Sequence, residues 1–254
     1  MDTATVEAGR EEVALASRVE RSTEPRVPLS RDRVLRAAIG IADEGGLEAL
    51  SMRKLAQDLG VEAMSVYHYV ANKDEILDGI LNFVITEFEL AVGGRDWKAA
   101  IRRSALSAHD VLMRHPWACN LMMSVKRVAP ARLRYMESLL RRLREAGFSA
   151  NMTHHAYHAL DSHIIGSTLW QAGYSSNADL EGVAKTFIMK TLREYPYLAE
   201  HAQEHMTRSK RRDVPEFEFG LDLILDGLEK IRATPARRAR TGRPRAMPPR
   251  RPSC

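Results

Sequence analysis

The chain has 254 residues, a net charge of +5, 44% hydrophobic residues and a mean hydropathy of −0.33. This length suits one large domain or a small module joined to a larger one. It contains no run of about 18 apolar residues that would predict a membrane-spanning helix, and residues 1–28 do not resemble a secretory signal. The two cysteines, Cys119 and Cys254, lie far apart, which predicts no disulfide framework and fits a cytoplasmic location.

The positive charge is concentrated at the carboxyl end of the chain. Residues 233–254 hold seven arginines and no acid, whereas residues 1–28 hold six acids and four bases, so residues 29–232 carry no net charge. Both ends are poor in large apolar residues, which leaves little surface to offset the entropy of ordering. We therefore predict a disordered head over 1–28 and a disordered arginine- and proline-rich tail over 233–254.

Helical signals fill the region between these ends, and strand signals such as Asn-Gly hairpins are missing, so the predicted fold class is all-α. Ser30, Ser51 and Asn72 suit helix N-caps, and glycines follow several of the apolar runs. The predicted helices span residues 31–44, 52–59, 62–69, 73–92, 97–114, 130–146, 150–172, about 179–193 and 216–232. We expect Gly45-Gly46 to end the first of these helices and Gly173 to end the helix over 150–172.

Residues 50–77, LSMRKLAQDLGVEAMSVYHYVANKDEIL, carry the most informative motif. Ala56, Gly60 and Val66 have the spacing of a helix-turn-helix. The small alanine lets the second helix approach, the glycine takes a turn with positive φ, and the valine packs the second helix on the first. The second helix is then free to lie in the major groove of DNA. Composition alone leaves an ordinary helical hairpin open as the alternative.

Residues 29–85, with this motif, resemble the DNA-binding domain of the tetracycline-repressor (TetR) family. Trp97 at a helix start, REAGFS at 144–149 and FEFGLDLILDGLE at 217–229 resemble the regulatory domain of the tetracycline repressors. The resemblance implies a three-helix DNA-binding domain over 29–76 and a helical ligand-binding and dimerisation domain over 77–232. It also implies a homodimer that binds a palindromic operator in double-stranded DNA and releases it when a small-molecule effector binds.

Carried over position by position, the operator contacts of the family fall on Arg53, Ala63, Met64, Ser65, Tyr67, His68 and Lys73. Arg53 suits a guanine or a phosphate, and Tyr67 and Lys73 suit phosphates. Ala63 and Met64 depart from the more polar residues of tetracycline repressors. Direct readout at these two positions would be apolar, for example to a thymine methyl group, so we expect a different operator sequence.

The resemblance also implies an effector cavity in the second domain. The histidine with which tetracycline repressors ligate drug-bound magnesium corresponds here to Met122, and polar drug contacts correspond to Ser104 and Leu139. A thioether does not ligate Mg²⁺, so we predict no metal, no cofactor and a less polar effector. The candidate effector-binding residues are Ser104, Ala108, Met122, Leu139, His154, Tyr157, His158 and Trp170.

Histidines gather on the helix predicted over 150–172. His154, His158 and Asp161 follow one another by about one turn, a pattern that also suits a metal site. Three ligands on one helix rarely converge, so we favour a polar border of the effector pocket, which Trp170 would close from the partner subunit. Cys119 is expected to be a buried small apolar residue rather than a thiol sensor.

The sequence thus predicts a transcriptional regulator that acts as a repressor. No enzyme is expected, because the chain lacks a phosphate-binding glycine loop, GxSxG and HExxH. Apolar stripes over 152–171 and 216–231, the latter with Leu221 and Leu225, predict a four-helix dimer interface. Two alternatives stay open: a metal- or small-molecule-binding protein with a vestigial helix-turn-helix, and an activator or DNA-compacting protein aided by the arginine tail.

Overall fold

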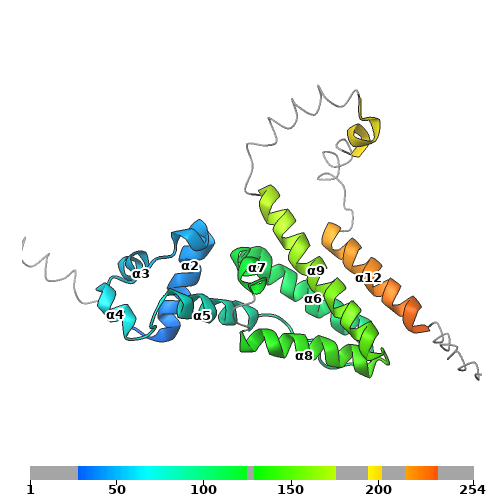
Figure 1. The fold of residues 1–254 in the computed structure, drawn as a ribbon, viewed down its shortest axis with the longest axis horizontal. Helices are drawn as coiled ribbons and strands as arrows, with labels where there is room; N and C mark the ends of the chain where they lie inside the picture. The colour runs from blue at the N-terminus through cyan, green and yellow to red at the C-terminus, as the bar shows by residue number, and fades with distance from the viewer. Residues whose placement is uncertain (1–27, 125–128, 176–193, 202–214, 234–254) are drawn as a thin grey trace, which may run out of the picture. The chain divides into compact units, whose positions relative to one another are not determined.

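The computed structural model describes residues 28–124, 129–175, 194–201 and 215–233, and these residues form helices without any strand (Figure 1). The predicted all-α fold class is confirmed. The chain divides into two compact units, residues 1–80 and 81–254. The predicted head, tail and helix over 179–193 lie outside the described residues, apart from Pro28 and Ala233.

The first unit contains α2 (Arg31–Ala49), α3 (Met52–Leu59), α4 (Ala63–Tyr67) and the first part of α5 (Lys73–Ile85). The three predicted caps form. The Ser30 and Ser51 hydroxyls accept from the backbone N–H of Arg33 and Lys54 at 3.2 Å, and the Asn72 amide oxygen accepts from Glu75 N–H at 2.9 Å. These side chains satisfy amides that a helix leaves unpaired in its first turn.

Of two predicted helix ends in this region, one was wrong. The helical run that begins at Arg31 is interrupted at Gly46, where φ is +72° and ψ is 178°, as predicted for Gly45-Gly46, and a second short helical stretch continues to Ala49. α5 ends at Ile85 rather than Val92, because the backbone changes there to shorter-range bonds such as Glu87 N–H to the Val84 carbonyl. Side chains of α6 (Trp97–Arg114) then hold the following segment. The Ser107 hydroxyl accepts from Glu89 N–H at 3.0 Å, and the Ser104 hydroxyl donates to the Glu89 carbonyl at 2.5 Å.

The second unit contains the rest of α5 and five further labelled helices: α6 (Trp97–Arg114), α7 (Trp117–Met122), α8 (Pro130–Glu145), α9 (Ala150–Ser175) and α12 (Glu216–Ala233). Residues 196–201 add a short helix. α6 ends before Pro116 as predicted, and that proline starts α7, which was not predicted. Gly173 lies inside α9 and does not end it, since glycine in a helix is unfavourable but not forbidden.

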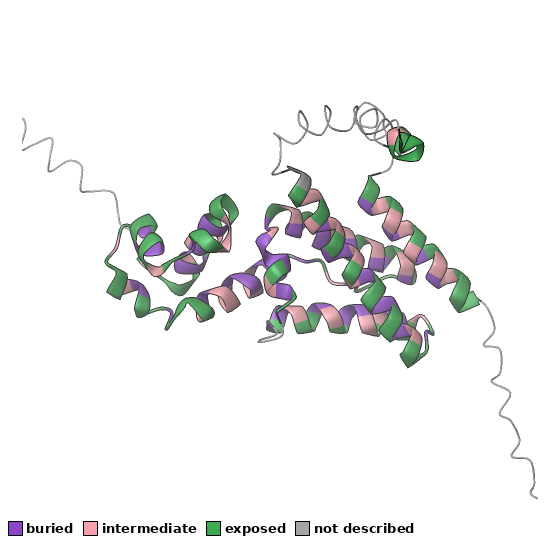
Figure 2. Ribbon diagram, turned by 45° about the horizontal axis from the view of Figure 1, so that its top comes forward, coloured by how far each residue is buried: buried purple, intermediate pink, exposed green. Residues whose placement is uncertain are grey.

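α12 packs on α6 and α9 of the same chain, and Figure 2 shows its buried and exposed residues on different sides. Phe217, Leu221, Leu225 and Leu228 are buried, with Leu221 and Leu225 fully inaccessible. The prediction that Leu221 and Leu225 meet a second subunit was therefore wrong, because they form part of the intrachain core. The exposed apolar side chains of α12 are instead Phe219, Leu223 and Ile231.

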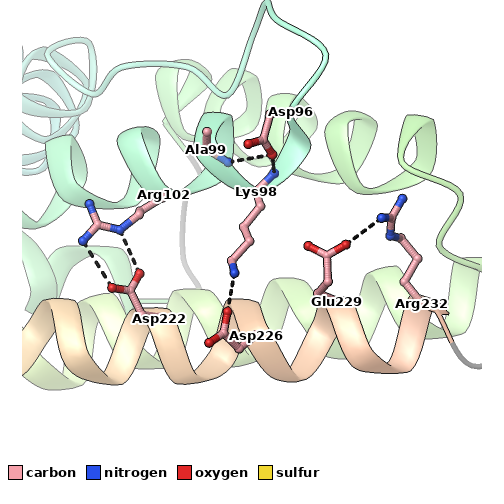
Figure 3. A network of polar contacts seen from close by, with 8 residues as sticks. All are labelled: Asp96, Lys98, Ala99, Arg102, Asp222, Asp226, Glu229 and Arg232. Carbon is pink, nitrogen blue, oxygen red and sulfur yellow. Dashed lines mark hydrogen bonds and ion pairs between the residues drawn. The ribbon is translucent and has the colours of Figure 1, made fainter.

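Charged side chains also join α6 to α12 (Figure 3). Arg102 donates to Asp222 at 2.8 Å and to Glu218 at 2.5 Å, and one turn earlier Lys98 pairs with Asp226. Hydrogen bonding to Asp222 and Glu218 raises the pKa of Arg102. Cations one turn apart on α6 thus meet carboxylates one turn apart on α12, which fixes the register of two antiparallel helices.

Gly60 makes the tight turn between α3 and α4. Its φ and ψ are 67° and 35°, the left-handed region that costs glycine little. The N–H of Gly60 donates to the Gln57 carbonyl, and that of Val61 donates to the Ala56 carbonyl at 3.0 Å. Ala56 and Val66 are buried on either side of the turn, as predicted.

Gly60→Ala should lower the free energy of unfolding by about 1 kcal/mol, because alanine is strained at this φ although its Cβ would meet no atom. Gly40→Ala is the matched control in the middle of α2, where an added Cβ also meets nothing. There the same change should raise stability by about 0.5–1 kcal/mol. Urea unfolding of both variants measures the difference, and equal effects would contradict the role of the turn.

Arg102→Met should lower the free energy of unfolding by about 1 kcal/mol, since two carboxylates lose one shared cation. Arg141→Met is the control, because its ion pair with Glu137 joins exposed residues of one helix. We expect less than about 0.5 kcal/mol there. Thermal unfolding in low and high salt checks both variants, and the Arg102 effect should shrink as salt screens the network.

Candidate DNA-binding and effector sites

α4 presents most of the residues predicted to contact DNA. Its Val66 is buried, whereas Met64 is 70% exposed and Tyr67 43% exposed. Ala63 and His68 are also exposed, and Ser65 is half-buried. The helix is shorter than the predicted 62–69, because Tyr69 N–H already turns back to the Val66 carbonyl. A short helix anchored by Val66 therefore offers its opposite side to a partner.

The other two predicted DNA contacts, Arg53 and Lys73, are exposed at the beginnings of α3 and α5. Lys73 has a structural bond that the sequence did not reveal: its ammonium donates to the Leu47 carbonyl at 3.2 Å. This bond ties the start of α5 to the end of α2 and leaves further protons of the ammonium for another acceptor.

Arg31 and Glu75 stabilise the same region through their side chains. The sequence analysis did not select either residue. One Glu75 carboxylate oxygen accepts from Ala71 N–H at 2.7 Å, and the other accepts from Arg31 at 3.2 Å. These bonds, led by the one from Ala71, lower the pKa of Glu75. The Asn-x-x-Glu spacing of Asn72 and Glu75 resembles a capping box, which would place the Glu75 carboxylate on the Asn72 N–H, one residue away from the Ala71 N–H that donates to it in the structure.

The predicted effector-binding residues fall into two groups in the second unit. Ser104, Ala108, Met122, Leu139 and Tyr157 are buried and come from α6, α7, α8 and α9. His154, His158 and Trp170 instead lie on the exposed side of α9, where Trp170 is 62% exposed. Within one subunit the structure therefore does not bring the histidines to the buried group.

A polar contact of the interior involves residues that the sequence did not select as effector contacts. Arg132 of α8 donates to Asp161 of α9 at 3.4 Å and to the Met122 carbonyl. Burial raises the pKa of Asp161, against the opposing effect of Arg132. Burial also raises the pKa of Tyr157 to about 12. Periodicity could not identify these residues, because arginine and aspartate at helical spacing are typical of a surface.

Asp161 is thus engaged away from the suggested metal site, although the rings of His154 and His158 lie 4.5 Å apart. Across the described ranges, no three His, Cys, Asp or Glu side chains come together in a way that could hold a metal ion. Cys119 is fully buried, and burial raises the pKa of its thiol to about 11. A protonated, inaccessible thiol fits the predicted apolar role.

A groove of about 300 Å³ lies between α9 and α12, lined by Gly166, Ser167, Trp170, Gln171, Glu216 and Phe217. Its lining includes the exposed Trp170 of α9 and the buried Phe217 of α12. Membrane spanning is a separate question. Among the helices that the structure describes, none combines the length and the apolar composition of a transmembrane segment.

Family models match both parts of the chain. Residues 34–80 match the model for bacterial regulatory proteins of the tetR family, and residues 91–232 match the tetracyclin repressor-like C-terminal domain. The HTH-type transcriptional repressor DrrR1 of Streptomyces coeruleorubidus is 33% identical over 219 residues, which cover 82% of this chain and 80% of that protein. The class C tetracycline repressor protein of Escherichia coli is 28% identical over 209 residues, or 81% of this chain and 93% of that protein.

Among solved structures, the chain is similar to the Streptomyces coelicolor TetR family protein ActR in complex with actinorhodin. The TM-score is 0.62 and the sequence identity 28%, and the match covers 82% of this chain and 100% of that chain. The two family models together cover most of the described helices. The chain therefore belongs to the TetR family: it is a DNA-binding transcription regulator with an N-terminal helix-turn-helix domain and a tetracycline-repressor-like C-terminal domain.

Proposed function

We propose that the protein is a repressor that binds a palindromic operator as a homodimer and releases it when a small, mainly apolar molecule enters the second unit. The exposed side of α4, with Met64 and Tyr67 beside the capped start of α5, is the observation that carries this proposal. The repressor names of relatives and the ligand complex of ActR support it. They favour DNA binding over a vestigial helix-turn-helix. We infer no enzymatic activity and a place of action on cytoplasmic DNA.

In this proposal, phosphates are bound by Tyr67, Lys73 and the amide end of α5. Base edges are read by Arg53, Ser65 and His68, while the apolar Ala63 and Met64 suit thymine methyl groups. The described part of the first unit needs no rearrangement to present these groups, since all except Ser65 are exposed.

The effector would bind among the buried Ser104, Ala108, Met122, Leu139 and Tyr157. α5 offers the connection to the DNA-binding unit, because Lys73–Ile85 contributes residues to both compact units. In its second half, the Asn82 amide oxygen accepts from Ala131 N–H at the start of α8, at 3.0 Å. A ligand that displaces α8 would therefore act on α5 and change the spacing of two recognition helices.

A second copy of the chain would cover the exposed side of α9 and α12. Phe219 and Leu223 are 58% and 59% exposed on α12, and small residues at Ala159, Ser162 and Gly166 permit close approach on α9. Homodimers are typical of the family. Such an interface would also cover Trp170 and the groove that it lines between α9 and α12.

A footprint on the DNA beside the protein's own gene tests the proposal as a whole. A discrete protected palindrome supports a repressor, whereas protection that spreads with concentration would favour the DNA-compacting alternative. A protein that binds no DNA at low salt would contradict the proposal altogether.

Tyr67→Phe and Lys73→Met should each weaken operator binding about three- to thirtyfold, because each removes a phosphate contact. Lys73→Met should also reduce the slope of log affinity against log salt by about one unit. Tyr69→Phe is the control for the tyrosine change. The measurement is fluorescence anisotropy over a salt series, with circular dichroism to show that each variant keeps its helix content. Unchanged affinity in both variants would remove this face from the DNA interface.

Phe219→Glu with Leu223→Glu should give a folded monomer that binds a palindrome poorly, because both side chains are exposed within one subunit. Leu221→Glu is the contrasting variant and should unfold the second unit, since Leu221 belongs to the core. Sedimentation and circular dichroism separate the two outcomes. A double variant that remains dimeric would refute the proposed interface.

Tetracycline should show no magnesium-dependent binding in calorimetry, because the Met122 thioether is not a ligand for a hard cation. Met122→His tests whether this one position determines magnesium-dependent binding of tetracycline. A gain of metal-dependent affinity in that variant alone would support the positional argument, and tight magnesium-dependent binding to the unaltered protein would contradict it.

A further inference from the structure

Polar side chains meet inside the second unit at the junction of α6, α8 and α9, and DNA binding makes no use of them. Arg132 and Asp161 form the ion pair of this junction, and each side chain is only 16% exposed. Arg132 also donates to the Met122 carbonyl. The pair is therefore a fixed contact without net charge, and its cation is already committed to two acceptors.

Tyr135 lies close to this pair with its hydroxyl unused. Its side chain is 2% exposed, and its ring packs edge-to-face on Phe88 with 5.1 Å between centroids. The hydroxyl is inaccessible and has no hydrogen-bond partner in the described parts of the chain. Ser104 is near enough to influence the pKa of Tyr135, but it donates its own proton to the Glu89 carbonyl and does not meet Tyr135 with hydrogen-bond geometry.

A buried hydroxyl without a partner is unfavourable, and native proteins seldom retain one. Among the described residues, no acceptor meets the Tyr135 hydroxyl in hydrogen-bond geometry. Burial is the main cause that raises the pKa of Tyr135, and the negative charge of Asp161 acts in the same direction. Because Arg132 is already engaged by Asp161 and the Met122 carbonyl, the described part of the junction has no free cation to compensate an anionic ligand, whereas a neutral acceptor needs none.

We propose that the Tyr135 hydroxyl determines effector specificity by donating to a neutral ketone- or quinone-type oxygen on an otherwise apolar molecule. The inference rests on the proposed function only in placing the effector among α6, α7, α8 and α9. The buried Met122 and Leu139 supply apolar contacts in the same unit, and the Arg132–Asp161 pair holds α8 and α9 around the donor.

Three probes of the same ring shape test this chemistry on the full-length protein. 9-Fluorenone carries one ketone oxygen, fluorene lacks it, and fluorene-9-carboxylate replaces it by an anion. Intrinsic tryptophan fluorescence reports binding. We expect fluorenone to bind about three- to tenfold more tightly than fluorene, the ratio that one added neutral hydrogen bond gives, and more tightly than the carboxylate.

Tyr135→Phe should abolish the preference for fluorenone while fluorene affinity and the melting temperature stay the same or rise, since only an unpaired hydroxyl is removed. Tyr195→Phe, at an exposed tyrosine, is the matched control and should keep the preference.

Equal binding of fluorenone and fluorene, absence of binding by both, or a preference that Tyr135→Phe retains would overturn the proposal. A lower melting temperature of Tyr135→Phe would also overturn it, because the hydroxyl would then have a structural partner. Failure of the proposed function is seen separately, as the absence of an operator footprint from a protein that still distinguishes fluorenone from fluorene.

Discussion

The second unit depends on the burial of one helix, α9, which packs against α6, α7, α8 and α12. Ala156, Leu160 and Ile164 are buried on successive turns of this helix. Even Thr168 fits this side, because its hydroxyl donates to the Ile164 carbonyl at 2.8 Å. The same helix carries Asp161 toward the interior and Trp170 toward the surface. An effector that moves α9 would therefore act on the interior and on the proposed dimer face together.

The DNA-binding unit could be predicted in detail because its determinants are local. Each cap joins residues three positions apart, and the Gly60 turn depends on the conformational freedom of one residue. Helix ends that depend on another element could not be predicted. α5 ends at Ile85, and serines of α6 bind the backbone segment that follows. The sequence pattern near Ile85 does not indicate that Ser104 and Ser107 would make these bonds.

The candidate sites show the same limit. The apolar stripe of α12 was visible in the sequence, but it does not say whether Leu221 meets its own chain or a partner. The answer comes from α6 and α9, which bury Leu221 and leave Phe219 exposed. Arg132 and Tyr135 were missed for the converse reason: polar residues on a helix are usually exposed, and only the packed structure shows them inside.

The magnitude of one hydrogen bond sets what Tyr135 can contribute to regulation. A net contribution of about 1 kcal/mol shifts a conformational equilibrium only about fivefold, whereas nearly complete switching between two states needs about 10⁴-fold differential affinity. Most of that difference must come from apolar surface, at about 25 cal/mol per Å² removed from water. The buried Met122 and Leu139 would then determine how strongly an effector shifts the equilibrium, and Tyr135 would determine which apolar molecule does so. The shift reaches DNA only through a contact that differs between the two states, and in the proposed mechanism that contact is the bond from Ala131 N–H at the start of α8 to the Asn82 amide oxygen in α5.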